Sequence, residues 1–254
     1  MILRSSQVAT FKACPAKAFY TFELGLTPIK KGFNIDLFFG SALHKAIEIY
    51  RLKNAIEATK YVNSLKFQET PRKNKSTLLS LVSQYIRDNN VEIIEPEKFF
   101  SFKVGSHIWK GRFDGICRYN NSLWVEEHKT TNPQYLLLRP NDQFIAYCLG
   151  GKVFYHEISG MIINLFNVDK ISIEKKFLSF SKDDYEDWID NMKMTAEFYT
   201  RCRHKQIFPE NPGACHMYNR PCTYLSICST SPGNRNMIVK NYFETNDSQR
   251  KLEW

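Results

Sequence analysis

The sequence predicts an α/β fold in which a central mixed sheet is flanked by helices. Apolar residues recur at helical spacing over residues 36–60 and 76–88. From residue 97 the pattern changes to strands rich in aromatic and β-branched residues. A further long helix is predicted from Ser181 to about Lys205. Helices before and after a group of strands favour a sheet with helices packed against it.

Local start and stop residues predict the N-terminal helices. Ser5-Ser6 is expected to cap a short first helix, and the Cys14-Pro15 step is expected to break or restart it. The helix over 36–60 has one apolar side, and Ser76 is expected to cap the helix that runs to residue 88.

Three strands are predicted to form a meander in the middle of the chain. KFFSFKV at 98–104 leads to a turn at Gly105-Ser106, HIWKGRFDGICRY then runs to a turn at Asn120-Asn121, and SLWVEEHK follows. Two more strands are expected near residues 158–167 and 171–180.

Two helices and a short tail strand are predicted in the second half. Residues 142–151 are expected to form a helix that Gly150-Gly151 closes. Gln143 and Tyr147 lie at i and i+4 and so share one face of it. The tail is expected either to hold a short strand at 237–243 or to be partly disordered. The helix from Ser181 should bury one face, made of Trp188, Met192, Thr195 and Phe198 or Tyr199.

The charge balance favours a polyanionic partner, since the 254 residues carry a net charge of +9. A basic turn at 69–75 holds Arg72, Lys73 and Lys75, which either contact a nucleic-acid backbone or belong to a solvated loop. No stretch approaches the roughly 20 apolar residues of a membrane span. The first residues lack the apolar run of a signal peptide. We therefore expect a cytoplasmic protein without membrane contact.

The predicted hairpin around Asn120-Asn121 carries the chemistry. Glu127 and Lys129 are two residues apart, so both project from one face of the second strand, and Asp114 lies on the first strand. A turn near Asn120-Asn121 brings Asp114 beside Glu127. Two carboxylates and a lysine are what a metal-dependent phosphodiesterase needs, because the carboxylates hold a hard cation and the lysine adds positive charge near the phosphate. Glu126 points to the opposite face and receives no role.

A histidine on the helix over 36–60 is a candidate for a further side of this site. His44 follows Gly40 in the pattern Gly-x-x-x-His, and Glu48 lies one turn later, where it can face the same point. Each also has an ordinary interpretation, His44 as a structural histidine and Glu48 as a surface residue.

A second candidate metal site lies in the proline-rich loop over 208–229. Its three cysteines, Cys215, Cys222 and Cys228, belong to no helix or strand face, and loops of this kind bind metals. The absence of a Cys-x-x-Cys pair argues against a zinc ribbon. Cys14 is the best candidate for a fourth ligand, and His216 is the alternative.

The competing interpretation of these cysteines is a set of buried free thiols. The chain has seven cysteines, an odd number, and is too long for a small disulfide scaffold. The expected cytoplasmic location is a reducing environment. In such an environment, clustered cysteines are more often metal ligands than disulfides. Cys117, Cys148 and Cys202 lie in regular elements and are expected to be buried thiols.

Taken together, these residues resemble the RecB-type nuclease branch of the PD-(D/E)XK superfamily. A single Glu-x-Lys is uninformative, but this sequence has a series of motifs in the family's order over residues 14–228. The motifs are Cys14-Pro15, Gly40-Ser-Ala-Leu-His44, Gly111-Arg-Phe-Asp114, Glu127-His-Lys129-Thr130, Gln143-Phe-Ile-Ala-Tyr147, and Cys215, Cys222 and Cys228.

The resemblance implies a restriction-endonuclease-like core and a role for each motif residue. Lys129 would position or activate the attacking water and stabilise the developing phosphorane charge. Gln143 and Tyr147 would orient Lys129 or the nucleic-acid strand. The implied ligands of Mg²⁺ or Mn²⁺ are His44, Asp114, Glu127 and the backbone carbonyl of His128.

The four-cysteine arrangement resembles the iron–sulfur subset of that branch. This subset includes AddB-type recombination nucleases and CRISPR-associated RecB-like exonucleases, in which one N-terminal and three C-terminal cysteines hold a [4Fe–4S] cluster. The resemblance implies that Cys14, Cys215, Cys222 and Cys228 do the same here. The C-terminal spacing lacks the usual Cys-x-x-Cys of those families, so zinc remains the alternative.

The implied activity is metal-dependent hydrolysis of DNA, as an exonuclease on single-stranded DNA or free ends. The implied settings are recombination, repair, or phage- or CRISPR-linked DNA processing, with a helicase, recombinase or CRISPR partner; a phage-encoded protein would act in the host cytoplasm. The alternatives are a structure-selective endonuclease or end-trimming subunit of a larger complex, and a non-catalytic DNA-binding iron–sulfur module.

The whole chain, residues 1–254, is expected to form one nuclease domain. Its expected parts are an N-terminal helical part at 1–95 with Cys14 and His44, a catalytic core at 96–207, a cysteine cluster loop at 208–229 and a tail at 230–254.

Overall fold

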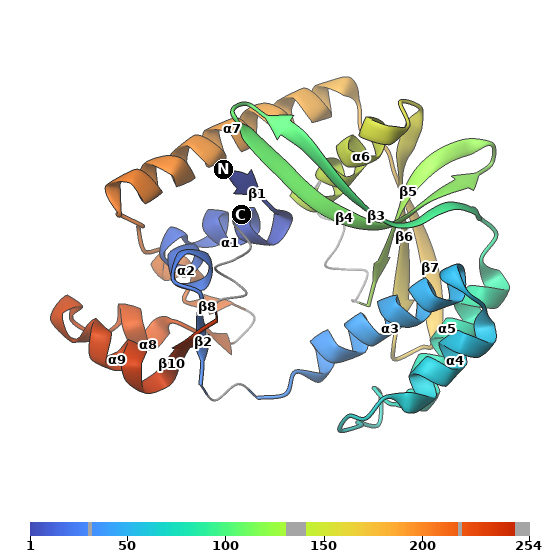
Figure 1. Cartoon of the computed structure of the whole chain (residues 1–254), viewed down its shortest axis with the longest axis horizontal. Coiled ribbons are helices and arrows are strands. Elements are labelled where there is room, and N and C mark those ends of the chain that lie inside the picture. Colours follow the sequence, from blue (N-terminus) through green and yellow to red (C-terminus); the bar gives the residue numbers. More distant parts are fainter. Residues whose placement is uncertain (30–31, 131–140, 218–219, 247–254) are drawn as a thin grey trace. The chain divides into compact units, whose positions relative to one another are not determined.

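The structure is a computed structural model that describes residues 1–29, 32–130, 141–217 and 220–246. The chain divides into two compact units (Figure 1). The sheet unit comprises Asn34–Phe102 and Lys110–Glu186. The terminal unit comprises Met1–Phe33, Lys103–Trp109 and Asp187–Trp254.

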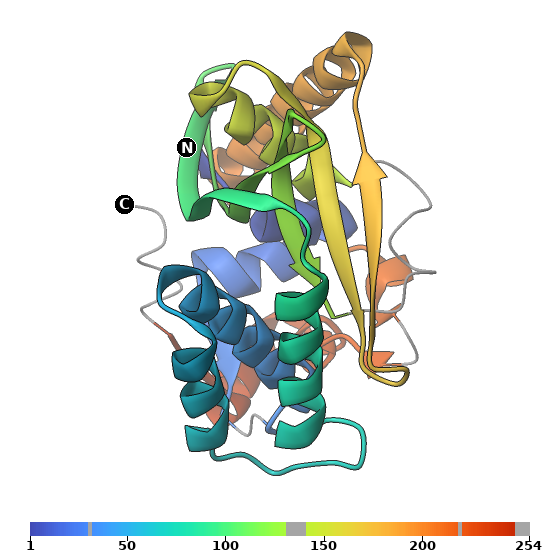
Figure 2. The ribbon, with the colours of Figure 1, turned by 90° about the vertical axis from the view of Figure 1, so that its right-hand side faces the viewer.

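The sheet unit is built on a mixed sheet, which confirms the predicted α/β fold. β4 is antiparallel to β5, β5 is parallel to β6, β6 is antiparallel to β7, and β3 pairs with β4. Figure 2 shows β6 and β7 as long adjacent arrows in yellow and gold. The strands are β3 (Glu92–Val104), β4 (His107–Tyr119), β5 (Ser122–Lys129), β6 (Ile158–Asn167) and β7 (Ser172–Leu178).

The β4–β5 hairpin turns where the sequence predicts it. Asn120 and Asn121 have φ angles of 47° and 62°, in the left-handed region that asparagine tolerates better than most residues. The hairpin register pairs Gly115 with Glu126 and Tyr119 with Ser122. This register fixes which residues of β4 and β5 lie beside each other.

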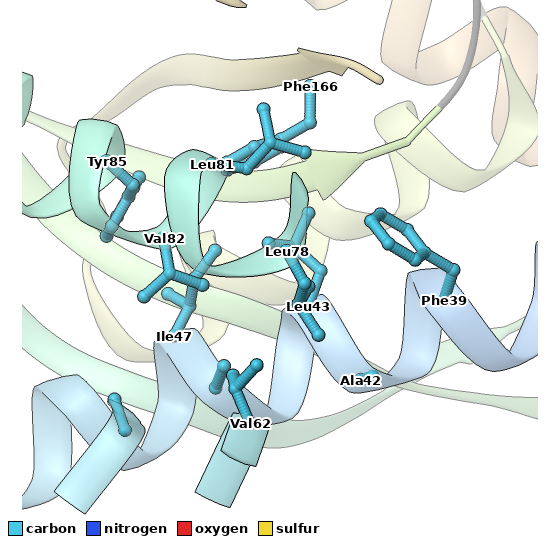
Figure 3. Close-up of a cluster of buried hydrophobic side chains, with 12 residues drawn as sticks. Phe39, Ala42, Leu43, Ile47, Val62, Leu78, Leu81, Val82, Tyr85 and Phe166 are labelled. Carbon is cyan, nitrogen blue, oxygen red and sulfur yellow. The ribbon is translucent and has the colours of Figure 1, made fainter. Parts of the chain in front are cut away.

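Three helices cover one face of the sheet: α3 (Ile35–Leu52), α4 (Ala55–Ser64) and α5 (Lys75–Asp88). Figure 3 shows their apolar side chains meeting in one core, with Phe166 contributed by β6. Each fully buried Leu, Ile or Phe in this core contributes about 1.5–3 kcal/mol to stability. The core is centred on Phe39, Leu43, Ile47, Val62, Leu78, Leu81, Val82, Tyr85 and Phe166.

Two predictions about these helices are wrong, and asparagine caps explain both. The single helix expected over 36–60 divides because Asn54 caps α4, its side chain accepting the Glu57 N–H at 3.0 Å. The cap of α5 is Asn74 rather than Ser76, since the Asn74 side chain accepts the Thr77 N–H at 2.8 Å.

α6 (Asp142–Phe154) covers the other face of the sheet. The expected end of this helix at Gly150-Gly151 is wrong, because both glycines lie inside it. A Cβ on Gly150 would lie 2.4 Å from the Phe100 ring, and one on Gly151 would lie 2.6 Å from Val125. These glycines allow close approach of helix and sheet instead of ending the helix.

The terminal unit combines both ends of the chain with short strands. β1 runs parallel to the start of β4, and β2 is antiparallel to β10. The strands are β1 (Ile2–Leu3), β2 (Leu26–Pro28), β8 (His216–Met217), β9 (Arg220–Pro221) and β10 (Phe243–Thr245). The helices are α1 (Ser5–Ala13), α2 (Pro15–Ala18), α7 (Lys182–Lys205, whose first residues belong to the sheet unit), α8 (Leu225–Cys228) and α9 (Arg235–Tyr242).

The terminal unit corrects three further predictions. α1 begins at Ser5 itself, with Arg4 in the cap position and no side-chain cap. The strand expected at 237–243 is helix α9, and β10 begins only at Phe243. On α7 the predicted Trp188, Met192 and Tyr199 are buried, but Thr195 is not, and Ala196 and Cys202 complete the buried face. In the described part of the chain, no helix has the length and apolar character to cross a membrane.

Candidate active site

Asp114 lies where the β4–β5 ladder ends, and its carboxylate replaces a backbone partner there. The paired residues nearest to it are Gly115 and Glu126. Just beyond this pair, one Asp114 carboxylate oxygen accepts the His128 backbone N–H at 2.7 Å. The other oxygen lies 3.1 Å from Nδ1 of His44 on α3. The carboxylate is thus held from two sides, by the sheet and by the helix.

Glu127 and Lys129 project from the α6 side of β5, as the strand alternation predicts. The Lys129 ammonium lies 2.5 Å from a Glu127 carboxylate oxygen and donates to Oε1 of Gln143 at 3.1 Å. The Gln143 amide in turn donates to the Tyr147 hydroxyl at 2.8 Å. The structure therefore brings four of the predicted site residues into one chain of contacts.

Asn141 explains why Gln143 stands at this place. Its side chain caps α6 by accepting the Gln143 N–H at 2.8 Å, which starts the helix one residue before Gln143. Gln143 and Tyr147 then lie one turn apart on the same face. The prediction that these two residues share a face of this helix is confirmed.

The two carboxyl groups have opposite pKa shifts. Burial alone would raise the pKa of Asp114, but the hydrogen bond from His44 and the charges of His128 and His44 outweigh it and hold the pKa well below its usual range. Burial and the charge of Asp114 raise the pKa of Glu127 to about 7. Burial alone would lower the pKa of His44, yet its hydrogen bond to Asp114 and that carboxylate's charge raise it.

The opposite face of β5 carries a buried polar network that sequence reasoning missed. Glu126 forms an ion pair with Arg51 of α3, and both side chains are 1% exposed. The Tyr85 hydroxyl donates to Glu126 at 3.2 Å, and the Asn164 amide donates to it at 2.5 Å. Burial alone would raise the pKa of Glu126, but the Arg51 charge outweighs it and lowers the pKa.

Arg51 links this network to the candidate site. Its Nη1 atom donates to the backbone carbonyl of Asp114 at 2.8 Å. Arg51 lies two helical turns after His44, so both side chains leave α3 on nearly the same side. The spacing between His44 and Arg51 was a sequence signal that could have placed Arg51 near the site. It is a weak signal, because an arginine in a helix is ordinarily exposed to solvent.

A cavity of about 470 Å³ opens beside His44. Gly40 lies in its wall, and a Cβ there would lie 3.1 Å from the Thr130 hydroxyl, so a small residue suits the helix–strand approach. The lining residues on α3 are Asp36, Leu37, Gly40, Ser41, His44, Lys45 and Glu48, and Glu97, Arg112 and Thr130 complete the wall.

The four candidate cluster cysteines lie around one cavity of the terminal unit. Cys14, Cys215, Cys222 and Cys228 line one cavity of about 40 Å³, with Tyr224 and Leu225 among the other lining residues. Cys117, Cys148 and Cys202 are buried elsewhere, as predicted. Among residues 1–29, 32–130, 141–217 and 220–246, no group of three or more His, Cys, Asp or Glu side chains is arranged to hold a metal ion.

Comparison with known proteins identifies both the sequence family and the fold. A family model described as the PD-(D/E)XK nuclease superfamily matches residues 5–229. The crystal structure of a "Putative exonuclease" from Eubacterium rectale shares the fold, with a TM-score of 0.54 at 10% identity over 91% of this chain and 94% of that chain. The crystal structure of SSO0001 covers 90% of this chain and 85% of its own at 16% identity, with a TM-score of only 0.43. No curated protein matches the sequence.

Proposed function

This chain belongs to the PD-(D/E)XK nuclease superfamily, and we propose that it is a divalent-metal-dependent deoxyribonuclease acting as an exonuclease on single-stranded DNA ends. The observation that carries the proposal is the convergence of Asp114, Glu127 and Lys129 at the end of the β4–β5 ladder, with His44 against Asp114. The matched family region includes residues of both units, which supports one nuclease domain.

By their chemical type, the donors in this site suit a hard divalent cation. Nucleases of this superfamily generally use Mg²⁺ or Mn²⁺. The buried Glu127 carboxylate, the partly buried Asp114 carboxylate and the His44 imidazole supply the oxygen and nitrogen ligands that such ions accept. When bound, the ion would activate water and neutralise charge on the phosphate. Its proposed ligands are His44, Asp114, Glu127 and the backbone carbonyl of His128.

Lys129, Gln143 and Tyr147 have separate roles in the proposed reaction. The water oxygen bonds to phosphorus while the bond from phosphorus to the leaving oxygen breaks. Lys129 orients that water and stabilises the negative charge that grows on the phosphoryl oxygens. Gln143 holds the Lys129 ammonium in direction through the 3.1 Å contact, and Tyr147 fixes the Gln143 amide.

Exonuclease action on single strands is the finer part of the proposal. Its support is the RecB/AddB-type motif series, the net charge of +9 and the structural neighbour described as a "Putative exonuclease". A helicase or recombinase partner would supply such ends. The test compares end-labelled linear single strands, linear duplexes and circular single strands in Mg²⁺ or Mn²⁺.

The expected result is metal-dependent shortening of linear single strands, with circular strands left intact. Cleavage of circles as fast as linear strands would show an endonuclease. No cleavage with either metal would contradict the nuclease proposal.

We also propose that Cys14, Cys215, Cys222 and Cys228 hold a [4Fe–4S] cluster. All four thiols line one cavity, and thiolates are the ligands of such clusters. The cluster would tie Cys14 to the C-terminal cysteines and so stabilise the terminal unit. Anaerobically purified protein should be brown and contain iron and sulfide. A colourless protein with stoichiometric zinc, or one without metal, would overturn this proposal.

A further inference from the structure

An exposed aromatic ring lies beside Arg112, a residue that lines the cavity next to His44. Phe99 is 75% exposed, the largest fraction among the exposed large hydrophobic residues of the described chain. It belongs to β3, where its neighbour Phe100 packs against α6 through Gly150 and Tyr147. Because adjacent strand residues face opposite sides, Phe99 points to the face that α3 covers.

Arg112 connects this ring to the cavity. Its guanidinium carbon lies 5.5 Å from the centroid of the Phe99 ring. The same side chain lines the cavity together with His44 and Lys45. Leu37, 67% exposed, adds an apolar side chain to the cavity wall. An aromatic face, an apolar side chain and two cations therefore lie within or beside one cavity.

The carboxylates of the cavity are neutralised by ion pairs. The three carboxylates each have a cationic partner: Asp36 pairs with Lys73, Glu48 with Lys45, and Glu97 with Arg112. The pair with Glu97 joins its carboxylate to one guanidinium nitrogen at 2.7 Å. A guanidinium has five N–H donors, so Arg112 retains donors for a phosphate oxygen.

We propose that Phe99 and Arg112 form a nucleotide-binding platform, on which Phe99 stacks against an unpaired base and Arg112 contacts the adjoining phosphate. This inference rests on the proposed function, because it assigns the DNA strand to the cavity beside His44. Stacking accepts any base, since each has a π face, and it requires a base that is not paired in a duplex. The platform would therefore select single strands without reading their sequence.

The chain provides a matched control on the opposite face of the same strand. Phe154 of α6 is 39% exposed and has its own cation, with the Lys98 ammonium 4.0 Å from its ring centroid. Lys98 precedes Phe99 in β3 and so faces the α6 side. Phe154→Ala removes a ring of the same type with the same kind of cation contact, away from the face that carries Phe99.

The test measures the Kd for a fluorescent single-stranded oligonucleotide in Mg²⁺, with all variants in the Lys129→Ala background so that the strand is not cut. Phe99→Ala is expected to raise the Kd about tenfold, the typical loss for one base–aromatic stack. Phe99→Trp should keep the affinity, and Phe154→Ala should leave the Kd unchanged. A single abasic site, moved along the oligonucleotide, should weaken binding by the same factor at one position and have no further effect on Phe99→Ala.

The outcomes separate this inference from the proposed function. An unchanged Kd for Phe99→Ala, equal losses for Phe154→Ala, or additive effects of Phe99→Ala and every abasic site would each overturn the platform. If the Lys129→Ala protein binds no single strand, the platform also fails. Cleavage by the unmodified protein is scored separately, so a protein that binds through Phe99 without cutting would contradict only the nuclease proposal.

Discussion

The two faces of β5 shift the pKa values of two adjacent glutamates in opposite directions. Glu126 and Glu127 are both almost fully buried, and burial alone raises the pKa of each. Glu126 faces the Arg51 guanidinium, whose charge lowers its pKa. Glu127 shares its surroundings with the Asp114 carboxylate, which adds to the burial effect and raises its pKa to about 7.

Only one of these two faces has its charge compensated by the fold itself. Glu126 has three partners from α3, α5 and β6, so its charge is compensated inside the fold. Glu127 has Lys129 as a partner but also a neighbouring carboxylate of the same sign. A cation bound between Asp114 and Glu127 would compensate the second face, whereas the first face needs none.

The largest expected effect is the loss of cleavage activity when residues on the Glu127 face of β5 are changed. Glu127→Gln removes a proposed metal ligand, and Lys129→Ala removes the proposed charge stabiliser; each should lower the cleavage rate at least about 100- to 1000-fold. The measurement is the rate of shortening of end-labelled single strands. Glu174 and Lys176 of β7 form an exposed Glu-x-Lys ion pair on a strand. Glu174→Gln should therefore retain full activity, and equal losses in this control would contradict the assignment.

The next effect separates the faces by stability. Glu126→Ala leaves the Arg51 charge buried without its carboxylate partner, which should cost about 3–5 kcal/mol of unfolding free energy. Glu57→Ala, which breaks an exposed pair with Lys60, should lower the unfolding free energy far less, because solvent screens a surface ion pair. Denaturant unfolding measures both. Similar losses of unfolding free energy for the two variants would show that Glu126 does not compensate the buried charge of Arg51.

The contrast between the faces also explains what sequence could predict. The alternation of strand residues is local, so the sequence alone is enough to place Glu127 and Lys129 together on one face. The turn at Asn120-Asn121 is also predicted from local sequence. The left-handed φ angles of both asparagines agree with that prediction. The Arg51–Glu126 pair joins residues 75 positions apart, and no local pattern indicates that an arginine in α3 is buried.

The wrong helix limits have two different origins. Gly150 and Gly151 read as a helix end, yet their missing side chains are required by Phe100 and Val125 on the sheet. Asn54 interrupts the expected helix over 36–60 because its side chain caps a new helix. The periodicity of apolar residues does not show such a cap. Packing partners distant in sequence decide the end of α6, whereas a local side-chain cap divides the expected helix over 36–60.

A smaller effect is expected when the cation is added to the protein. Binding only to the folded state raises the unfolding free energy by about 2.7 kcal/mol at a metal concentration of 100 times Kd. Mg²⁺ or Mn²⁺ should therefore raise the Tm of the unmodified protein in a thermal scan. Glu127→Gln should abolish most of this shift, while Glu174→Gln should keep it. A full metal shift in Glu127→Gln would place the cation elsewhere.

The smallest expected effect tests whether the Tyr147 hydroxyl helps Gln143 to position Lys129. Tyr147→Phe keeps the ring that packs against Phe100 but removes the hydroxyl that accepts from Gln143 at 2.8 Å. One neutral hydrogen bond contributes about 0.5–1.5 kcal/mol, so kcat should fall about 3- to 10-fold with KM unchanged. Tyr155→Phe is the control, because its hydroxyl donates to Glu95 at 2.9 Å instead. A raised KM with unchanged kcat for Tyr147→Phe would mean that Tyr147 contacts the strand directly, and that Gln143 directs Lys129 without its help.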